Sequence, residues 1–354
     1  MADGSSQHGL RRVGLVLTGG TIGCEVEGGG AEELVLLREG DEAPELELVR
    51  EAAEKTVELS VRRPLRLTSE NMAPSSWVAI AEAIATLLAE DRVDSILVLH
   101  GTDTMAYTSA ALSFMLADTG VPIVLTGANR PVGEPGSNAR RNIEDSLIAL
   151  AALNPGAYVL FAEGDEPTPV HLGTRVRKVA APGGTFASVG RAPVGVVRDG
   201  RFEPSTSPED PVAKPDRPAG LGRIDIDPRV LALRLYPGLD FGWVAPAISS
   251  EEVRGVVLEI YPSVTGPVGD SGLSATRFVE RCASSGVPVV AATASPLGRE
   301  FARYESTAAL EAAGVAILPM LPEVATVKMM WVLAGADDSA TVLELMRDEI
   351  AGEF

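Results

Sequence analysis

Cysteine and histidine are scarce in this chain of 354 residues. The two cysteines, Cys24 and Cys282, are too few and too far apart for a disulfide framework or a zinc cluster. The three histidines, His8, His100 and His171, lack the spacing of metal ligands. We therefore expect a protein that uses neither a metal ion nor another cofactor.

Basic residues are fewer than acidic residues. The chain has 30 Lys and Arg against 49 Asp and Glu, which gives a formal net charge of −19. This balance argues against a nucleic-acid partner and a membrane surface, because phosphate binding depends on Lys and Arg. No apolar run reaches the roughly 20 residues of a membrane span. The N-terminal segment MADGSSQHGLRR lacks the apolar stretch of a secretory signal, so we expect a cytoplasmic protein.

Apolar residues, in contrast, are plentiful. They make up 45% of the chain, with 22% charged residues, as in a well-packed α/β protein. The length exceeds that of one ordinary core, which favours two domains. Proline, glycine and charged residues dominate residues 203–227, as is typical of a linker. We predict an N-terminal α/β domain at 1–204, a linker at 205–226 and a C-terminal α/β domain at 227–354.

Short apolar strands alternate with amphipathic helices in both predicted domains, which indicates parallel sheets. In the first domain we predict strands at 13–17, 95–99, 122–125 and 158–161, helices at 76–91 and 141–153, and a hairpin at 193–202. In the second we predict strands at 230–235, 253–260 and 287–291, and helices at 276–284, 322–333 and 339–350. Ligands of open α/β sheets bind at the carboxyl ends of strands, so the loops that follow strands are the candidate sites.

Two of these loops carry hydroxyl groups. Residues 18–23 (TGGTIG) follow the first strand, but they lack the Gly-Lys-Ser/Thr ending of a phosphate loop and a complete dinucleotide fingerprint. Residues 100–104 (HGTDT) follow the strand at 95–99 and place a hydroxyl beside a carboxylate. Alone, this second loop is equally well explained as a Thr-Asp turn or a helix cap.

Acyl transfer from an amide needs a nucleophile and a base that takes its proton. The chain has no Gly-x-Ser-x-Gly motif, and its cysteines and histidines form no recognisable nucleophile and base pair. A threonine nucleophile with a lysine base is the option that remains.

These motifs resemble those of the bacterial-type L-asparaginase family, which carries Thr-Gly-Gly-Thr-Ile after its first strand and His-Gly-Thr-Asp-Thr after a later one. The resemblance covers nearly the whole chain, and further matching segments are 69–72 (SENM), 125–131 (LTGANRP), 322–323 (PE) and 327–331 (VKMMW). It implies a two-domain α/β fold with a larger N-terminal parallel-sheet domain and a smaller C-terminal α/β domain. The implied reaction is hydrolysis of a small-molecule carboxamide, with L-asparagine as the favoured substrate.

The resemblance also assigns catalytic roles. Thr21 matches the nucleophile, and Thr102 matches a second catalytic hydroxyl with Asp103 beside it. Lys178 matches a lysine that hydrogen-bonds Thr102 and draws its proton. The alternative for Lys178 is an ordinary solvated lysine, since Arg175 and Arg177 lie beside it in the sequence.

Substrate-binding roles follow from the same resemblance. Ser69 and Glu70 match the loop that holds the α-carboxylate and α-amino groups of the substrate, and Asp103 shares the amino contact. The backbone of Ala128 matches the segment that lies against the scissile amide. The alternative for Ser69 and Glu70 is a helix-start cap before Pro74.

The chain departs from the family pattern at three places. It has no tyrosine before Tyr107, although the family's mobile flap often carries one next to the nucleophile. Ser137 and Asn138 stand where relatives usually have Ser-Asp. Residues 261–267 (YPSVTGP) replace a Gly-Asn-Gly turn that contributes across the subunit interface in many relatives.

Three other functions stay open at this point. The substrate can be another carboxamide, such as glutamine, a D-amino-acid amide or a biosynthetic intermediate. The chain can also be a ligand-binding relative without turnover. A related tRNA amidotransferase component is disfavoured by the negative charge and by the short segment before residue 18. The resemblance further implies a homodimer or homotetramer.

Overall fold

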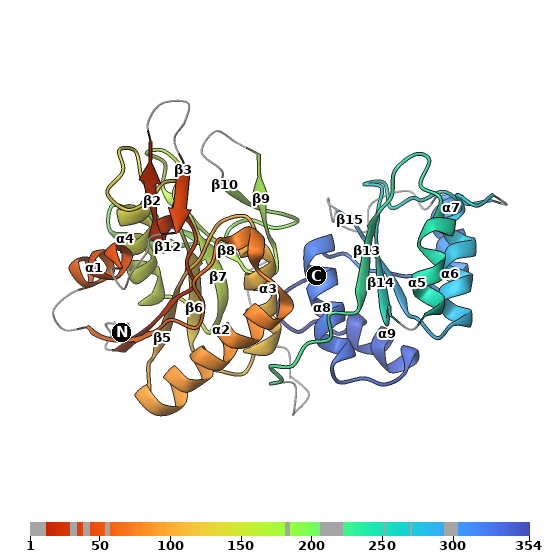
Figure 1. Ribbon diagram of the computed structural model, residues 1–354, viewed down its shortest axis with the longest axis horizontal. Coiled ribbons are helices and arrows are strands. Elements are labelled where there is room, and N and C mark those ends of the chain that lie inside the picture. The colour runs from red at the N-terminus through yellow and green to blue at the C-terminus, as the bar shows by residue number, and fades with distance from the viewer. Residues whose placement is uncertain are drawn as a thin grey trace, which may run out of the picture. The chain divides into compact units, whose positions relative to one another are not determined.

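The computed structural model describes residues 12–28, 34–37, 43–53, 57–180, 185–205, 222–250, 252–269, 271–293 and 304–354. The chain divides into two compact units, each with a sheet of its own (Figure 1). The N-terminal unit comprises Met1–Ala213 and Pro218–Ile224, and the C-terminal unit comprises Lys214–Arg217 and Asp225–Phe354. Most of the predicted linker lies outside the described residues, so the proposed boundaries at 204 and 227 stay a prediction.

The N-terminal unit is built on an eight-stranded sheet with the order β12-β11-β8-β7-β6-β5-β1-β4. Its strands are β1 (Arg12–Leu17), β4 (Glu58–Arg62), β5 (Ser95–Leu99), β6 (Pro122–Thr126), β7 (Gly156–Leu160), β8 (Thr168–Leu172), β11 (Gly195–Arg198) and β12 (Arg201–Pro204). The prediction of a parallel sheet is correct from β4 to β7, and the predicted hairpin at 193–202 is confirmed as the antiparallel pair β11 and β12. Strand β8, which was not predicted, pairs antiparallel with both β7 and β11. The direct connections from β7 to β8 and from β11 to β12 are too short for the crossover that parallel pairing needs.

Helices cover both faces of this sheet, with α1 (Pro44–Ala52) and α4 (Ala139–Leu150) on one face (Figure 1). Helices α2 (Pro74–Thr86) and α3 (Met105–Met115) pack on the other, and a π-helical turn (Leu87–Asp91) extends α2. Side chains that alternate along β1 join α4 in one apolar core. Burial of the sheet on both faces explains why its central strands are continuously apolar.

Several elements of this unit have no periodic signal in the sequence. Nearly every residue of α3 is buried, so this helix has no polar face and no amphipathic pattern. Two hairpins also escaped prediction, because their strands are short and partly polar. They are β2 (Cys24–Glu27) with β3 (Leu34–Leu37), and β9 (Val176–Val179) with β10 (Thr185–Ser188).

The C-terminal unit contains a four-stranded parallel sheet with the order β13-β14-β15-β16, as the alternating pattern predicts. Its elements are β13 (Val230–Arg234), α5 (Ala245–Ser249), β14 (Gly255–Ile260), α6 (Ala275–Ser284), β15 (Val289–Thr293), α7 (Glu305–Ala312), β16 (Ala316–Ile317), α8 (Pro322–Leu333) and α9 (Ser339–Arg347). The last helix ends at Arg347, earlier than predicted.

A buried ion pair explains one residue of the C-terminal motif. The Lys328 ammonium of α8 lies 2.7 Å from the Glu353 carboxylate, and both side chains are fully buried. Glu353 also accepts a backbone hydrogen bond from Ile350 at 3.0 Å. Removal of one partner from such a pair is strongly destabilising. Lys328 therefore anchors the last residues of the chain to α8.

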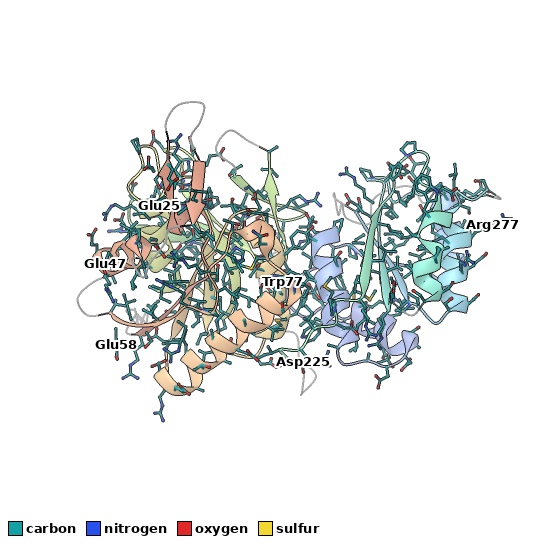
Figure 2. All side chains as sticks on the ribbon, in the orientation of Figure 1. Glu25, Glu47, Glu58, Trp77, Asp225 and Arg277 are labelled. Carbon is teal, nitrogen blue, oxygen red and sulfur yellow. The ribbon has the colours of Figure 1, made fainter. Side chains whose placement is uncertain are left out.

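The acidic residues lie mainly at the surface. Glu47 and Glu58 are exposed at the periphery of the N-terminal unit (Figure 2). Each pairs with an arginine, Glu47 with Arg50 at 2.6 Å and Glu58 with Arg12 at 3.1 Å. Exposed pairs of this kind contribute little to stability, so the surplus of carboxylates serves solubility. Among the described residues, no helix is both long and apolar enough to cross a membrane.

Candidate active site

The strand order places a topological switch point between the carboxyl ends of β1 and β5. The chain passes from β1 to β4 on one side and then to β5 on the other side of β1. Ligands bind at such a topological switch point, because the loops leave the sheet in opposite directions there. Residues 18–23 follow β1 and residues 100–104 follow β5. The two loops selected from the sequence thus lie at the position where the fold favours a site.

Contact between two glycines brings these loops together. A Cβ atom on Gly20 would lie 2.4 Å from the Cα atom of Gly101, so residue 20 has no room for a side chain. Gly20 also has a φ of 79°, a conformation that favours glycine. Thr21 and Thr102 directly follow the two touching glycines. Close backbone packing therefore brings the segments that carry both predicted catalytic hydroxyls to one edge of the sheet.

Ser69 joins the same cluster from a third loop. A Cβ atom on Gly101 would lie 2.6 Å from the Ser69 hydroxyl oxygen. That oxygen accepts a hydrogen bond from the Asp103 backbone N–H at 3.2 Å, and the Thr104 hydroxyl donates to the Ser69 carbonyl at 2.8 Å. Ser69 is 4% exposed, and its role in this geometry is to hold the loop after β5.

The interpretation of Ser69 and Glu70 as a helix-start cap is wrong. They form a separate 3₁₀ turn, Ser69–Asn71, while α2 begins at Pro74 with Ala73 at its N-cap position, where the Ala73 N–H donates to the Ser76 hydroxyl. Glu70 is exposed, and within the described residues no hydrogen bond or ion pair engages its carboxylate. The Glu70 side chain therefore faces solvent at the edge of the cluster, next to the buried Ser69.

Lys178 reaches the loop after β5 from the β9–β10 hairpin. Its ammonium donates to the Thr102 hydroxyl oxygen and to the Asp103 carboxylate, each at 2.7 Å. The side chain is 29% exposed. The alternative of a freely solvated lysine is therefore wrong. The paired strand holds Phe186 opposite Lys178, and the Phe186 ring packs edge-on against Phe161 with centroids 5.4 Å apart.

His100 supports this loop from the protein interior. Burial lowers the pKa of its imidazole to about 4, so the ring is neutral at physiological pH. Its Nε2 lies 2.9 Å from the Thr108 hydroxyl, which accepts from the Trp77 indole at 3.1 Å. Thr108 therefore donates to Nε2, and the Nδ1–H donates to the Gly101 carbonyl at 2.6 Å. Sequence reasoning assigned no such role to His100, because only the fold reveals Thr108 and Trp77 as its neighbours.

The loop after β6 completes the cluster. A Cβ atom on Gly127 would lie 2.2 Å from the His100 carbonyl oxygen, so this loop lies directly against the loop after β5. Ala128 follows Gly127 and is 2% exposed. The structure thus gathers Thr102, Asp103, Lys178 and Ser69 through direct contacts. It brings in Thr21 and Ala128 through the glycines that precede them.

The chemical inventory of this cluster is the hydroxyls of Thr21, Thr102 and Ser69, the amine of Lys178 and the carboxylates of Asp103 and Glu70, at the end of a parallel sheet. An amine within hydrogen-bonding distance of a hydroxyl is an arrangement that can move a proton to or from that hydroxyl. The fold and the site together define a two-domain α/β protein with a threonine-lysine centre suited to acyl transfer.

Comparison with known proteins gives the family. A model of the asparaginase N-terminal domain matches residues 12–209, and a model of the glutaminase/asparaginase C-terminal domain matches residues 229–346. The chain therefore belongs to the asparaginase family, and it is an amidohydrolase. The resemblance seen in the sequence motifs is confirmed.

Individual relatives carry two different names. An L-asparaginase from Thermococcus kodakarensis is 33% identical over 87% of this chain and 90% of its own length. The thermostable L-asparaginase of that organism also matches as a solved structure, with a TM-score of 0.77, 30% identity and coverage of 97% of this chain and 98% of that chain. A component of the glutamyl-tRNA(Gln) amidotransferase from Methanopyrus kandleri is 34% identical over 98% of this chain and 75% of its own length.

The glycine contact can be tested by adding one methyl group. We expect Gly101→Ala to lower kcat/KM by about 100-fold, because displacement of a catalytic group by about 1 Å has an effect of that size. Gly222→Ala is the matched control, since its Cβ would meet only Asp118 at an ordinary 3.6 Å. Ammonia release and thermal unfolding are measured for both variants. Full activity of Gly101→Ala would contradict the close packing described here.

Proposed function

We propose that this protein hydrolyses the side-chain carboxamide of L-asparagine to L-aspartate and ammonia. The observation that carries the proposal is the Lys178 ammonium, which lies 2.7 Å from both the Thr102 hydroxyl and the Asp103 carboxylate. Ligand binding alone does not require an amine behind a hydroxyl, so this pairing favours catalysis over a binding protein without turnover. The name and coverage of the relative from Thermococcus kodakarensis support asparagine as the substrate.

The proposed reaction proceeds through an ester on Thr21. The Thr21 hydroxyl oxygen forms a bond to the carboxamide carbon while its proton is transferred to the substrate nitrogen. The C–N bond then breaks and ammonia leaves. A water molecule attacks the ester while its proton passes to Thr102 and the Thr102 proton passes to Lys178, which acts in this step as the neutral amine. The proton then returns to the departing Thr21 oxygen, which restores the Thr21 hydroxyl and releases aspartate. Thr102 is the alternative nucleophile of this pair.

Substrate recognition is assigned to the carboxylates at the edge of the cluster. An α-amino group is an ammonium at neutral pH, and a carboxylate is its natural partner. Asp103 and the exposed Glu70 are therefore proposed to bind the α-amino group, and Ser69 to contact the α-carboxylate. Ala128 is proposed to contact the carboxamide through its backbone. Recognition of the charged groups of the substrate favours a free amino acid over a simple amide.

Another amidase reaction is the second candidate. The Methanopyrus kandleri relative is named as part of an amidotransferase, and this chain covers 75% of its length. The net charge of −19 supports a small-molecule substrate over tRNA, because tRNA binding depends on basic residues. Glutamine and D-amino-acid amides remain the alternatives within the same chemistry. We also propose a cytoplasmic location, where buried thiols such as those of Cys24 and Cys282 stay reduced.

Substitutions in the cluster test the mechanism. We expect Thr21→Ala, Thr102→Val and Lys178→Met each to lower kcat by about 1000-fold or more, because they remove parts of one proton-transfer unit. The effects of double substitutions should not add, for the same reason. Asp103→Asn should raise KM for asparagine as well. Steady-state kinetics of ammonia release give these values, and circular dichroism checks the fold.

The matched control is Arg198→Met, a basic residue that is exposed on β11 and pairs with Glu203. Its activity should equal that of the wild type. If the fold-loss in kcat of the Thr102→Val/Lys178→Met double variant equalled the product of the two single losses, a shared proton path would be contradicted. Normal turnover by Thr21→Ala/Thr102→Val would refute the threonine mechanism itself.

A panel of carboxamides tests the substrate assignment. Ammonia release is measured with L-asparagine, D-asparagine, L-glutamine and an amide without an α-amino group. We expect L-asparagine to have the highest kcat/KM, and the amide without the amino group to lose at least about 100-fold, since it leaves carboxylates unpaired. A preference for glutamine or a D-amide would replace the proposed substrate and retain the proposed chemistry.

Exposed apolar side chains in the C-terminal unit support assembly into a homodimer or homotetramer. Tyr236, Trp243, Val268 and Leu273 are between 41% and 73% exposed, which makes them candidates for the contact between subunits that the resemblance to the family implies. Light scattering should give at least twice the mass of one chain, and Trp243→Ser should weaken the association. A monomer with full activity would exclude the assembly.

A further inference from the structure

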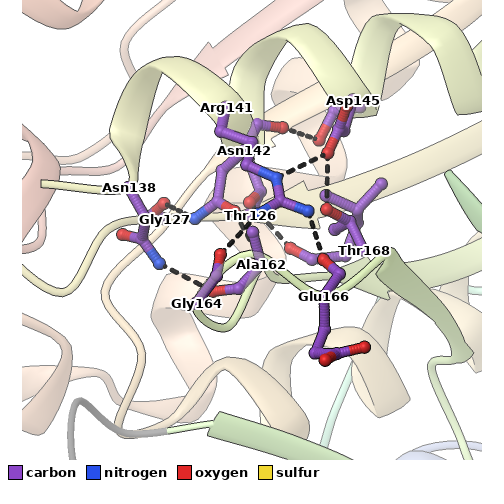
Figure 3. A network of polar contacts seen from close by, with 12 residues as sticks. Thr126, Gly127, Asn138, Arg141, Asn142, Asp145, Ala162, Gly164, Glu166 and Thr168 are labelled. Atoms are coloured by element: carbon purple, nitrogen blue, oxygen red, sulfur yellow. Dashed lines mark hydrogen bonds and ion pairs between the residues drawn. The ribbon is translucent and has the colours of Figure 1, made fainter. Parts of the chain in front are cut away.

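Two asparagine side chains connect the loop after β6 to the end of β7 (Figure 3). Asn142, on α4, is fully buried. Its amide nitrogen donates to the Gly127 carbonyl at 2.8 Å, and its amide oxygen accepts from the Ala162 N–H at 2.7 Å. A side chain with both a donor and an acceptor is needed for this double contact, and asparagine supplies both.

Asn138, at the start of α4, makes the second connection. Its side-chain oxygen accepts from the Asn129 backbone N–H at 2.9 Å, and its side-chain nitrogen donates to the Ala162 carbonyl at 2.9 Å. The Asn138 backbone N–H in turn donates to the Asn129 side chain at 3.1 Å. An aspartate at this position would have no amide N–H to donate to Ala162. The departure from the family pattern at Asn138 therefore adds a contact.

These contacts fix both peptide planes that flank Ala128. The carbonyl and the N–H of a trans peptide point in opposite directions. Because the Gly127 carbonyl points to Asn142, the Ala128 N–H points away from Asn142. Because the Asn129 N–H points to Asn138, the Ala128 carbonyl points away from Asn138. Both backbone groups of Ala128 are thus aimed by asparagine side chains on the opposite side of the loop.

The N–H and the carbonyl of Ala128 are both positioned to form hydrogen bonds with a ligand. Ala128 is 2% exposed, yet within the described residues neither its N–H nor its carbonyl takes part in a hydrogen bond. Buried backbone groups nearly always have a partner, so this pair indicates a position that a bound molecule fills. Gly127 packs against the His100 carbonyl, which places this position next to the loop of Thr102.

We propose that Asn138 and Asn142 are positioning residues that aim the Ala128 carbonyl at the nitrogen of the scissile carboxamide. This inference rests on the amidase function proposed above. A carboxamide nitrogen carries hydrogens that the carbonyl accepts, whereas the leaving oxygen of an ester carries none. The two asparagines thereby select an amide leaving group over an ester.

Helix α4 has a further attachment that does not depend on these asparagines. The Arg141 guanidinium donates to the carbonyls of Gly164 and Glu166, and Asp145 accepts from the Thr168 hydroxyl (Figure 3). These contacts secure α4 to the connection between β7 and β8. Loss of one asparagine side chain therefore leaves the helix attached, and the effect on the loop after β6 can be measured separately.

The test compares an amide with an ester that forms the same acyl-enzyme. We measure kcat/KM for L-asparagine and for L-aspartate β-methyl ester, because this constant reports the step in which the leaving group departs. Asn142→Ala and Asn138→Ala should each lower the value for asparagine by about 10-fold relative to the ester, the size of one good hydrogen bond. Ser146→Ala is the control, since Ser146 is buried on α4 and its hydroxyl donates, among the described residues, to the Asn142 backbone carbonyl of the same helix alone.

The outcomes separate this inference from the proposed function. An equal loss for amide and ester, or no loss for either, overturns the positioning role. If Asn142→Ala does not fold, Asn138→Ala decides, because its site is only partly buried. A wild-type enzyme that releases no ammonia from any carboxamide refutes the proposed function and this inference together. An active wild type with unchanged amide-to-ester ratios in the variants refutes the positioning alone.

Discussion

The site depends on the contact between the backbones of loops that leave neighbouring strands. Gly20 meets Gly101, Gly101 meets Ser69, and Gly127 meets the carbonyl of His100, each at a distance that excludes a Cβ atom. These contacts are possible only because parallel strands end at the same edge of the sheet. The glycines therefore allow these loops to lie close enough to form the site, in addition to allowing the loops to fold. A catalytic group adjacent to such a contact has little freedom to move.

Side chains from more distant segments then fix what the glycines bring together. Lys178 arrives from a hairpin outside the main sheet. His100 is neutral because it is buried, and its ring is oriented by the Thr108 hydroxyl, which also accepts from Trp77. Asn138 and Asn142 hold the neighbouring loop from the opposite side. All of these groups belong to the N-terminal unit. Rigid support of this kind is what electrostatic stabilisation of a transition state requires, because the groups need no rearrangement during reaction.

Much of the fold could be predicted from the sequence, since buried strands such as β5 and β14 appear as short apolar runs and amphipathic helices such as α4 leave a periodic pattern. Helix α3 left none because it is buried all round. The motifs that hold Thr21, Thr102 and Lys178 were found through their resemblance to a family. The contacts of His100 and Asn142 were not predicted, because only the fold places Thr108 against the His100 ring and Gly127 and Ala162 against Asn142, and one neutral polar side chain leaves no pattern in the sequence. The hairpin of β11 and β12 was predicted from its Asp199-Gly200 turn, whereas the antiparallel pairing of β8 with its neighbours was not, because β8 itself left no recognised pattern.

The central claim is that Thr21 carries the acyl group during turnover. Mass spectrometry of the enzyme quenched with a slow ester substrate tests it most directly, because the adduct can be assigned to one peptide. We expect an added aspartyl group on the peptide that contains Thr21, and no adduct in Thr21→Ala. We also expect accumulation of that adduct in Lys178→Met, where water attack on the ester is slowed. An adduct on any other residue, or turnover by Thr21→Ala at the wild-type rate, would contradict the account.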